Sequence, residues 1–177
     1  MVSIGFPGPV VNGKPAVNPP TLAKGWLGFD FEGHFKKPVK IINDAAMQAL
    51  GSYRGGRMLF IGLGTGVGSA LILDDVIIPL ELGELKYSKK NTVAEILGKE
   101  CLKKIGTKRW EKAVHEVVPR LAAAFRTDYV VIGGGNSKRL KRLPACARRG
   151  SNDRAFTGGA RLWTGAVQAK KHTWVIR

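Results

Sequence analysis

Phe60-Ile-Gly-Leu-Gly-Thr-Gly-Val-Gly-Ser-Ala-Leu71 is the stretch that decides the fold of this chain, because its glycines at 62, 64, 66 and 68 interrupt two apolar runs. The apolar residues predict two strands, and the glycines between them allow a tight turn that presents bare N–H groups to an anion. No Gly-Lys-Ser/Thr follows, as a P-loop would require, and the glycines lead into a strand instead of the helix of a dinucleotide fingerprint. Two alternatives stay open, a phosphate-binding hairpin and an ordinary glycine-rich β-turn.

The size and composition of the chain indicate a globular protein. Its 177 residues are enough for one domain or two small lobes, and 44% of them are hydrophobic. There is neither an apolar run near the roughly 18 residues of a membrane span nor a basic-then-apolar leader, so we expect a soluble cytoplasmic protein with no membrane partner. Cys101 and Cys146 lie far apart, which excludes a disulfide framework and a cysteine zinc site and indicates reduced, structural thiols.

Positive charge is concentrated in the second half of the chain. Residues 1–85 carry equal numbers of basic and acidic side chains, so the whole net charge of +16 lies in residues 86–177. Such asymmetry indicates attraction to nucleic acid, polyphosphate or another polyanion, and the alternative is a solvated basic face that keeps the protein soluble. The basic half has few aromatic residues for base stacking, which argues against nucleic acid.

Carboxylates follow two apolar segments on either side of the glycine stretch. Val39 to Asp44 is predicted to be a buried strand, and a helix starting at Ala45 follows and stops at the Gly55-Gly56 pair. Asp44 therefore lies at a strand-to-helix junction, where it either serves a ligand or caps the helix. Glu81 and Glu84 are the only charges of the apolar, extended segment 76–85, where a carboxylate is costly unless it is exposed or functional.

The basic half is predicted to contain helices and a second strand-then-glycine motif. Thr92-Val-Ala-Glu95 is a capping box that opens a helix closing at Gly106, and a second helix from Thr107 has a kink at Pro119. The segment 128–136 runs from a strand into three glycines, and a helix predicted over 137–143 makes this a candidate anion or nucleotide site. A helix over 155–163 and a basic tail over 164–177 complete the chain. The basic side chains that follow the glycines are candidates for binding a polyanion: Lys138, Arg139, Lys141 and Arg142.

Taken in order, eight segments of the chain resemble the ROK family of bacterial sugar kinases and repressors, and within it the polyphosphate glucokinase-like branch. The resemblance runs from Ser3 to Trp163. Its carriers are Gly5-Phe-Pro-Gly8, Asn18 with Trp26, Asn43-Asp-Ala45, Leu63-Gly-Thr-Gly-Val-Gly68, Glu81-Leu-Gly83, Lys108-Arg-Trp110, Val131-Ile-Gly-Gly-Gly-Asn136 and Phe156-Thr-Gly-Gly-Ala-Arg-Leu-Trp163.

The resemblance implies an α/β protein of the actin-like ATPase, or ribonuclease H-like, fold, with ligands bound between two lobes. It divides the chain into a remnant of the N-terminal lobe over 1–43, a C-terminal α/β lobe over 44–163 and the basic tail over 164–177. Family members begin with a further segment that contains an Asp-x-Gly-Gly-Thr/Ser phosphate loop, whereas Met1 here falls inside a later strand of the family. We therefore expect an N-terminally truncated chain with an incomplete first lobe, whose exposed sheet edge favours a homodimer or low stability.

The same resemblance implies a sugar kinase that transfers a phosphoryl group from ATP or polyphosphate, with Mg²⁺, to the 6-hydroxyl of glucose or a similar hexose. Asp44 matches the general base. The residues that match sugar ligands are Asn18, Asn43, Glu81 and Glu84. Gly64, Thr65 and Gly66 match the second phosphate loop, and Gly133, Gly134 and Gly135 match the adenosine-side motif.

Three departures from the family pattern bear on these expectations. Glu84 replaces a histidine of many relatives, so a hydrogen-bond donor becomes an acceptor and sugar preference changes. The cysteine-rich zinc motif of many members is missing, and His34, His115 and His172 lack metal-ligand spacing, so we expect no zinc. Because the first phosphate loop is also missing, the alternative function is a non-catalytic remnant or regulator that binds sugar or a polyanion.

Overall fold

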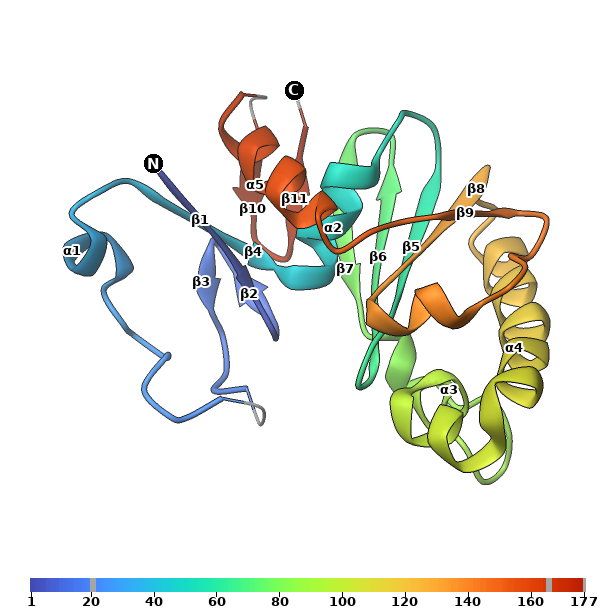
Figure 1. Ribbon diagram of the computed structural model, residues 1–177. Coiled ribbons are helices and arrows are strands. Elements are labelled where there is room, and N and C mark those ends of the chain that lie inside the picture. Colours follow the sequence, from blue (N-terminus) through green and yellow to red (C-terminus); the bar gives the residue numbers. More distant parts are fainter. Residues whose placement is uncertain (20–21, 165–166, 177) are drawn as a thin grey trace.

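The computed structural model describes residues 1–19, 22–164 and 167–176, and its centre is a seven-stranded mixed sheet (Figure 1). The strand order is β10-β11-β7-β6-β5-β8-β9. The strands of this sheet are β5 (Met58–Leu63), β6 (Val67–Leu73), β7 (Val76–Leu80), β8 (Tyr129–Gly133), β9 (Ala147–Arg149), β10 (Gln168–Lys170) and β11 (Thr173–Val175).

The predicted glycine hairpin is present in the middle of this sheet. Strands β5 and β6 pair in antiparallel register, with Gly62 opposite Gly68 and Leu63 opposite Val67. Strand β8 runs parallel to β5 on its other side, and Gly62 also lies opposite Gly133. Both glycine-rich loops therefore leave the sheet at the same edge, where the carboxyl ends of parallel strands place ligands.

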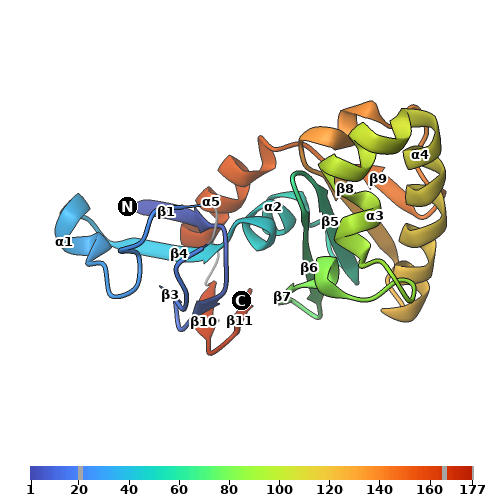
Figure 2. The same cartoon turned by 90° about the horizontal axis from the view of Figure 1, so that it is seen from below.

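Helices cover both faces of the sheet, as Figure 2 shows. Helices α2 (Asp44–Ser52) and α5 (Arg154–Thr164) lie on one face, and α3 (Val93–Leu97) and α4 (Lys99–Ala124) lie on the other. Along β5 the side chains of Met58 and Phe60 enter the first core, while those of Leu59 and Ile61 enter the second. This strand is apolar throughout because both of its faces are buried.

Helices α2 and α5 approach each other through glycines. A Cβ at Gly51 would collide with the carbonyl of Arg154, and a Cβ at Gly158 would collide with the carbonyl of Met47. Any side chain at either position would force the two helix backbones apart. The small-residue helix predicted near the C-terminus therefore packs as expected, and the helix beginning at Asp44 is held against it.

The first residues form two smaller sheets beside the main one (Figure 2). Strands β1 (Val2–Phe6) and β4 (Val39–Asn43) pair in parallel, and β2 (Val10–Val11) and β3 (Lys14–Pro15) form a hairpin. The hairpin turns at Asn12 and Gly13, which have φ values of 49° and 73°. Two consecutive positive φ values are typical of a type I′ turn, for which Asn-Gly is the preferred sequence. Helix α1 (Phe31–Phe35) lies between the hairpin and β4 along the chain.

The segment predicted to be a basic tail, 164–177, forms part of the sheet in its described residues. Strands β10 and β11 pair with each other, and β11 pairs with β7 by placing Trp174 opposite Ile77. Trp174 is buried in the first core. The prediction of a tail was wrong here because it weighed the basic residues and missed the short apolar stretch around Trp174. Residues 165, 166 and 177 of the predicted tail lie outside the described residues.

The predicted helix that opens at Thr92 is divided in the structure. The capping box at Thr92 is present, but Gly98 takes an extended conformation and ends α3 after Leu97, so the following residues belong to α4. The break predicted at Gly106 is present within α4, where Gly106 has the non-helical angles φ 75° and ψ 161°, and a helix continues from Thr107 as predicted. The helix predicted over 137–143 is instead a 3₁₀ helix, η2 (Gly135–Arg139), and Leu140 directly after it is extended. No helix of the described residues is long and apolar enough to span a bilayer.

Candidate active site

Asp44 is the first residue of α2, directly after β4, and the helix is capped by its neighbour. The Asn43 side-chain oxygen accepts a hydrogen bond from the Ala46 N–H at 3.1 Å, and its amide donates to the Gly8 carbonyl at 3.3 Å. Asn43 is buried, and its side-chain oxygen and amide both make hydrogen bonds at this junction, while Asp44 is exposed. Of the two predicted roles for Asp44, helix cap or ligand contact, the capping role belongs to Asn43, and Asp44 keeps an oxygen available for a ligand.

The pKa of Asp44 lies above its ordinary value. Desolvation by the surrounding protein raises the pKa, and the hydrogen bond that Asp44 Oδ1 accepts from the Ala45 N–H at 2.7 Å offsets part of this rise. Strand β1 passes close by, since a Cβ at Gly5 would lie 3.4 Å from the Asp44 Cα. A carboxylate that keeps solvent access and binds a proton more readily than usual has the properties of a general base.

Glu81 and Glu84 join Asp44 in an acidic region at the end of β7. The pKa of Glu81 is raised first by desolvation and then by repulsion from the carboxylates of Glu84 and Asp44. Both glutamates are exposed, and Glu84 lies in the 3₁₀ helix η1 (Leu82–Glu84). Three carboxylates from two segments therefore lie in one region, with Glu81 close enough to Glu84 and Asp44 to be repelled by both, which suits the binding of several hydroxyl groups.

Ser69 holds the turn that carries Glu81, and the sequence analysis did not single it out. Its buried hydroxyl donates to the Leu80 carbonyl at 2.8 Å and accepts from the Leu82 N–H at 3.0 Å. The backbone on both sides of Glu81 is thereby fixed. Ser69 could have been identified from the sequence as the lone serine of the apolar strand 67–73, because a hydroxyl buried in such a strand nearly always has a hydrogen-bond partner.

The loop Gly64–Gly66 closes the β5–β6 hairpin and leaves part of its backbone open. Gly64 N–H donates to the Gly66 carbonyl at 3.1 Å, whereas the N–H groups of Thr65 and Gly66 donate no hydrogen bond within the described residues. Neither Gly64 nor Gly66 has a positive φ, and a Cβ at either position would meet no close neighbour. The fold therefore does not require glycine at 64 or 66, and their absence of side chains leaves the backbone accessible to a ligand.

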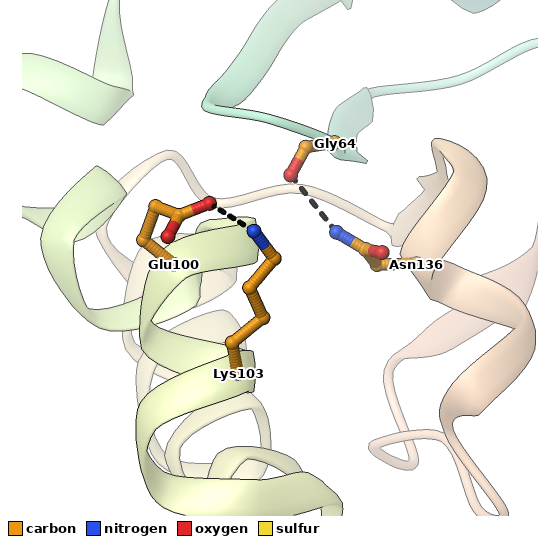
Figure 3. A network of polar contacts seen from close by, with 4 residues as sticks. All are labelled: Gly64, Glu100, Lys103 and Asn136. Carbon is orange, nitrogen blue, oxygen red and sulfur yellow. Dashed lines mark hydrogen bonds and ion pairs between the residues drawn. The ribbon is translucent and has the colours of Figure 1, made fainter.

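A side chain from the second glycine motif anchors this loop, as Figure 3 shows. The Asn136 amide donates to the Gly64 carbonyl at 2.9 Å, and the Lys99 N–H at the start of α4 donates to the same carbonyl at 3.1 Å. The ion pair between Lys103 and Glu100, 2.8 Å, lies on α4 nearby (Figure 3). The role of Asn136 was missed in the sequence, where an amide directly after three glycines was its only signal.

The three glycines of the second motif have different environments. Gly133 ends β8 and is buried against the Phe60 ring. Gly134 has φ 80°, and a Cβ there would collide with the backbone of Leu63, one residue before the first loop. Gly135 is exposed, with open space around it. The two glycine loops therefore form one packed unit, and the open backbone lies at its exposed side.

The remaining candidate residues lie apart from this unit or only border it. The Asn18 side-chain oxygen accepts hydrogen bonds from the N–H groups of residues 25, 26 and 27 at 3.1, 3.0 and 3.4 Å, so it organises the loop that carries Trp26. Its role as a sugar ligand stays a prediction. The basic side chains after the second motif are all exposed: Lys138, Arg139, Lys141 and Arg142. A cavity of about 920 Å³ is lined by parts of β3, α1, β4 and β10 and does not include Asp44.

A metal cage is not formed by the described part of the chain, where no three His, Cys, Asp or Glu side chains are placed to hold an ion together. Magnesium in phosphoryl transfer is typically held by one or two carboxylates together with waters and substrate phosphates. The Asp44 and Glu81 region offers such carboxylates, but their arrangement assigns no metal ligand.

The fold is similar to that of ROK family sugar kinases, which have the actin-like ATPase fold. An inorganic polyphosphate/ATP-glucomannokinase from Arthrobacter sp. strain KM superposes with a TM-score of 0.71 at 26% identity and covers 89% of this chain and 71% of its own. A ROK family glucokinase from Streptomyces griseus, solved in complex with glucose and AMPPNP, superposes with a TM-score of 0.70 at 15% identity, covering 89% and 79%. The second similarity is one of fold alone.

The sequence is also similar to a polyphosphate glucokinase of Mycobacterium tuberculosis, with 27% identity over 154 residues. The matched region is 78% of this chain, and the chain spans 57% of the length of that relative. No protein-family model matches the chain. The resemblance to ROK family sugar kinases, and to their polyphosphate glucokinase-like branch, is confirmed by the sequence and structural relatives together.

Proposed function

We propose that the chain is a glucokinase-like phosphotransferase that moves the terminal phosphoryl group of ATP or polyphosphate to the 6-hydroxyl of glucose or a similar hexose. The observation that carries this proposal is the state of Asp44. Its carboxylate is exposed and has a raised pKa, and the neighbouring Asn43, not Asp44, caps the helix. The relatives named above, a polyphosphate glucokinase and a polyphosphate/ATP-glucomannokinase, support the choice of donor and acceptor.

Asp44 would act as the general base of the reaction. A carboxylate oxygen takes the proton of the sugar hydroxyl as that oxygen attacks the terminal phosphorus in line. The bond between phosphorus and the bridging oxygen breaks, and ADP or a polyphosphate shortened by one unit leaves. A raised pKa assists this step because it makes the carboxylate a better proton acceptor.

The open loop would bind the phosphates of the donor. Thr65 and Gly66 have N–H groups without an acceptor in the described structure, and such groups stabilise the charge that develops on phosphoryl oxygens. The start of α2 packs on β6 just beyond this loop, since a Cβ at Gly68 would lie 3.1 Å from the Ala45 Cβ. This packing places the base and the loop on neighbouring elements.

Hydroxyl groups of the sugar would be bound by the acidic region. Glu81 and Glu84 accept hydrogen bonds, and their shared repulsion is relieved when hydroxyl donors approach. Asn43 accepts one hydrogen bond and donates one within the protein, so a second amide N–H and a second lone pair of its oxygen would contribute to binding the sugar. Gly133 to Gly135 would lie on the nucleotide side of the donor when ATP is used.

A coupled assay of glucose 6-phosphate formation tests the proposal with ATP and with polyphosphate as separate donors. Asp44→Asn is expected to lower kcat by about 10²-fold to 10⁴-fold, the usual contribution of a general base. Asp74→Asn is the matched control, because Asp74 is an exposed aspartate in the β6–β7 turn and is expected to leave kcat unchanged.

Absence of turnover by the unmodified chain with either donor would refute kinase activity for this chain. Glucose binding by calorimetry without turnover would then support the alternative, a non-catalytic sugar-binding protein. An equal loss of activity in both aspartate variants would refute the role of Asp44.

A further inference from the structure

A small basic pocket lies on the face of the sheet that α2 and α5 cover. Its volume is about 210 Å³. The end of α2, strands β8 and β9 and the start of α5 contribute its lining residues: Ser52, Arg54, Tyr129, Val131, Arg148, Arg149, Gly150 and Arg154. The pocket extends from Tyr129 at the start of β8 to Gly150, which packs beside Gly133 at the end of that strand, so it adjoins the second glycine motif without including its residues.

Arginine dominates this lining, and no carboxylate belongs to it. Ion pairs in the described residues join Lys103 to Glu100 and Arg120 to Glu116, so the guanidinium groups of the pocket are not neutralised by any of them. Arginine presents several N–H donors in a planar fork that matches phosphate oxygens. The side chains of Arg54, Arg148 and Arg154 generate a local positive potential that favours an anion, whereas the Arg149 guanidinium is bonded to backbone carbonyls outside the pocket.

The protein holds parts of this lining in fixed positions. The Arg149 guanidinium donates to the carbonyls of Ser137 and Leu140, and the Arg148 guanidinium lies 4.6 Å from the centre of the Tyr129 ring. The Tyr129 hydroxyl accepts a hydrogen bond from the backbone N–H of Arg54 at 3.1 Å. Arg148 keeps its N–H edges free while its plane is stacked, so it can bind an anion with little loss of side-chain entropy.

A buried hydroxyl in the lining lacks a partner. Ser52 Oγ is inaccessible to solvent and makes no hydrogen bond within the described residues. Buried hydroxyl groups are nearly always satisfied by protein or by a bound molecule. Ser52 lines the pocket, so a rotation of its hydroxyl toward an acceptor oxygen bound there would satisfy this donor, and the observation is independent of the arginines.

We propose that this pocket is a binding site for a phosphate group, formed by residues other than those of the candidate phosphate loops. Its volume is below the roughly 300 Å³ at which pockets for drug-sized ligands begin, so it fits a phosphate or pyrophosphate moiety. The moiety comes either from a free diphosphate or from the end of a polyphosphate chain. The inference does not depend on the sugar kinase proposal, because none of the lining residues belongs to that site.

Amide NMR titration with pyrophosphate tests the site residue by residue. We expect saturable shift changes at the backbone amides of Ser52 and Gly150. The double variant Arg148→Gln/Arg154→Gln should weaken this response at least about tenfold, because each arginine supplies charge-assisted hydrogen bonds. The control Arg109→Gln/Lys112→Gln removes the same charge from the exposed side of α4 and should leave the response within about twofold.

Two outcomes would overturn the proposal: no saturable change at Ser52 and Gly150 in the unmodified protein, or an equal weakening in both double variants. Ser52→Ala provides a second test that preserves the fold, and it should weaken the response severalfold by removing the one hydroxyl donor. An unchanged response in Ser52→Ala together with an unchanged response in the arginine variant would refute the site.

Separate titrations identify the source of the phosphate group. Saturation by pyrophosphate and not by long-chain polyphosphate at the same phosphate concentration would assign the site to free diphosphates, and saturation by both would assign it to chain ends as well. Failure of both would overturn the inference. Absence of kinase turnover leaves these shifts unaffected, so the two proposals fail independently.

Discussion

Replacing Gly134 with alanine should destabilise the protein more than any neighbouring glycine replacement. Gly134 has φ 80°, and a Cβ there would collide with the Leu63 backbone. The left-handed conformation costs about 1–2 kcal/mol for a residue with a Cβ, and overpacking against an unyielding backbone costs about 1–3 kcal/mol. The expected loss is therefore about 2–5 kcal/mol, a large share of the ~5–15 kcal/mol that stabilises a typical protein.

Gly135→Ala is the matched control for this prediction. Gly135 is exposed, its φ is not positive, and a Cβ would meet nothing within 4 Å. Its replacement should change the free energy of unfolding by less than about 0.5 kcal/mol. Urea unfolding followed by tryptophan fluorescence measures both variants, since Trp110 and Trp174 are buried. A Gly134→Ala variant within about 0.5 kcal/mol of the unmodified protein would refute the packing of the two glycine loops.

Further predictions concern the cap, the acidic region and the loop anchor. Thr92→Ala removes the reciprocal capping box of α3 and should cost about 1 kcal/mol in urea unfolding, and an unchanged midpoint would contradict the cap. Because the folded protein raises the pKa values of Asp44 and Glu81, it binds their protons more tightly than the unfolded chain, so stability should fall as pH rises from about 4 through the raised values. Asp44→Asn should reduce this slope and be the more stable protein at neutral pH, and urea titrations from acid to neutral pH that show the same slope for both would exclude the effect. Asn136→Ala removes the amide bond to the Gly64 carbonyl, so it should cost about 0.5–1.5 kcal/mol of stability and raise KM for the donor, and coupled assays with an unchanged donor KM would rule out a positioning role.

Local patterns of the sequence were sufficient to predict the central elements. The alternation of apolar runs and glycines in residues 60–71 requires a hairpin, because glycine permits the turn and the apolar flanks require burial on both faces. The capping box at Thr92 and the apolar strand before Gly133 were also readable, since each depends on residues only a few positions apart. The order of these elements was enough to indicate the ROK sugar kinase fold.

The connections between distant segments were decided by the tertiary structure. The sequence left open whether Asp44 caps its helix, and the answer depends on Asn43 reaching both Ala46 and the Gly8 carbonyl of another segment. The link from Asn136 to Gly64 joins residues 72 positions apart. Both rest on the pairing of strands that are remote in the chain, which no local pattern encodes.

The glycine hairpin shows which features the sequence determines and which depend on the tertiary structure. Sequence alone determined that residues 64–66 form a tight turn between buried strands, because backbone freedom and hydrophobic burial act locally. Only the tertiary structure showed that the turn is held from outside by Asn136 and Lys99 and that its remaining N–H groups stay open. The physical reason is that hydrogen-bond partners for an exposed turn come from whichever segments the fold brings beside it.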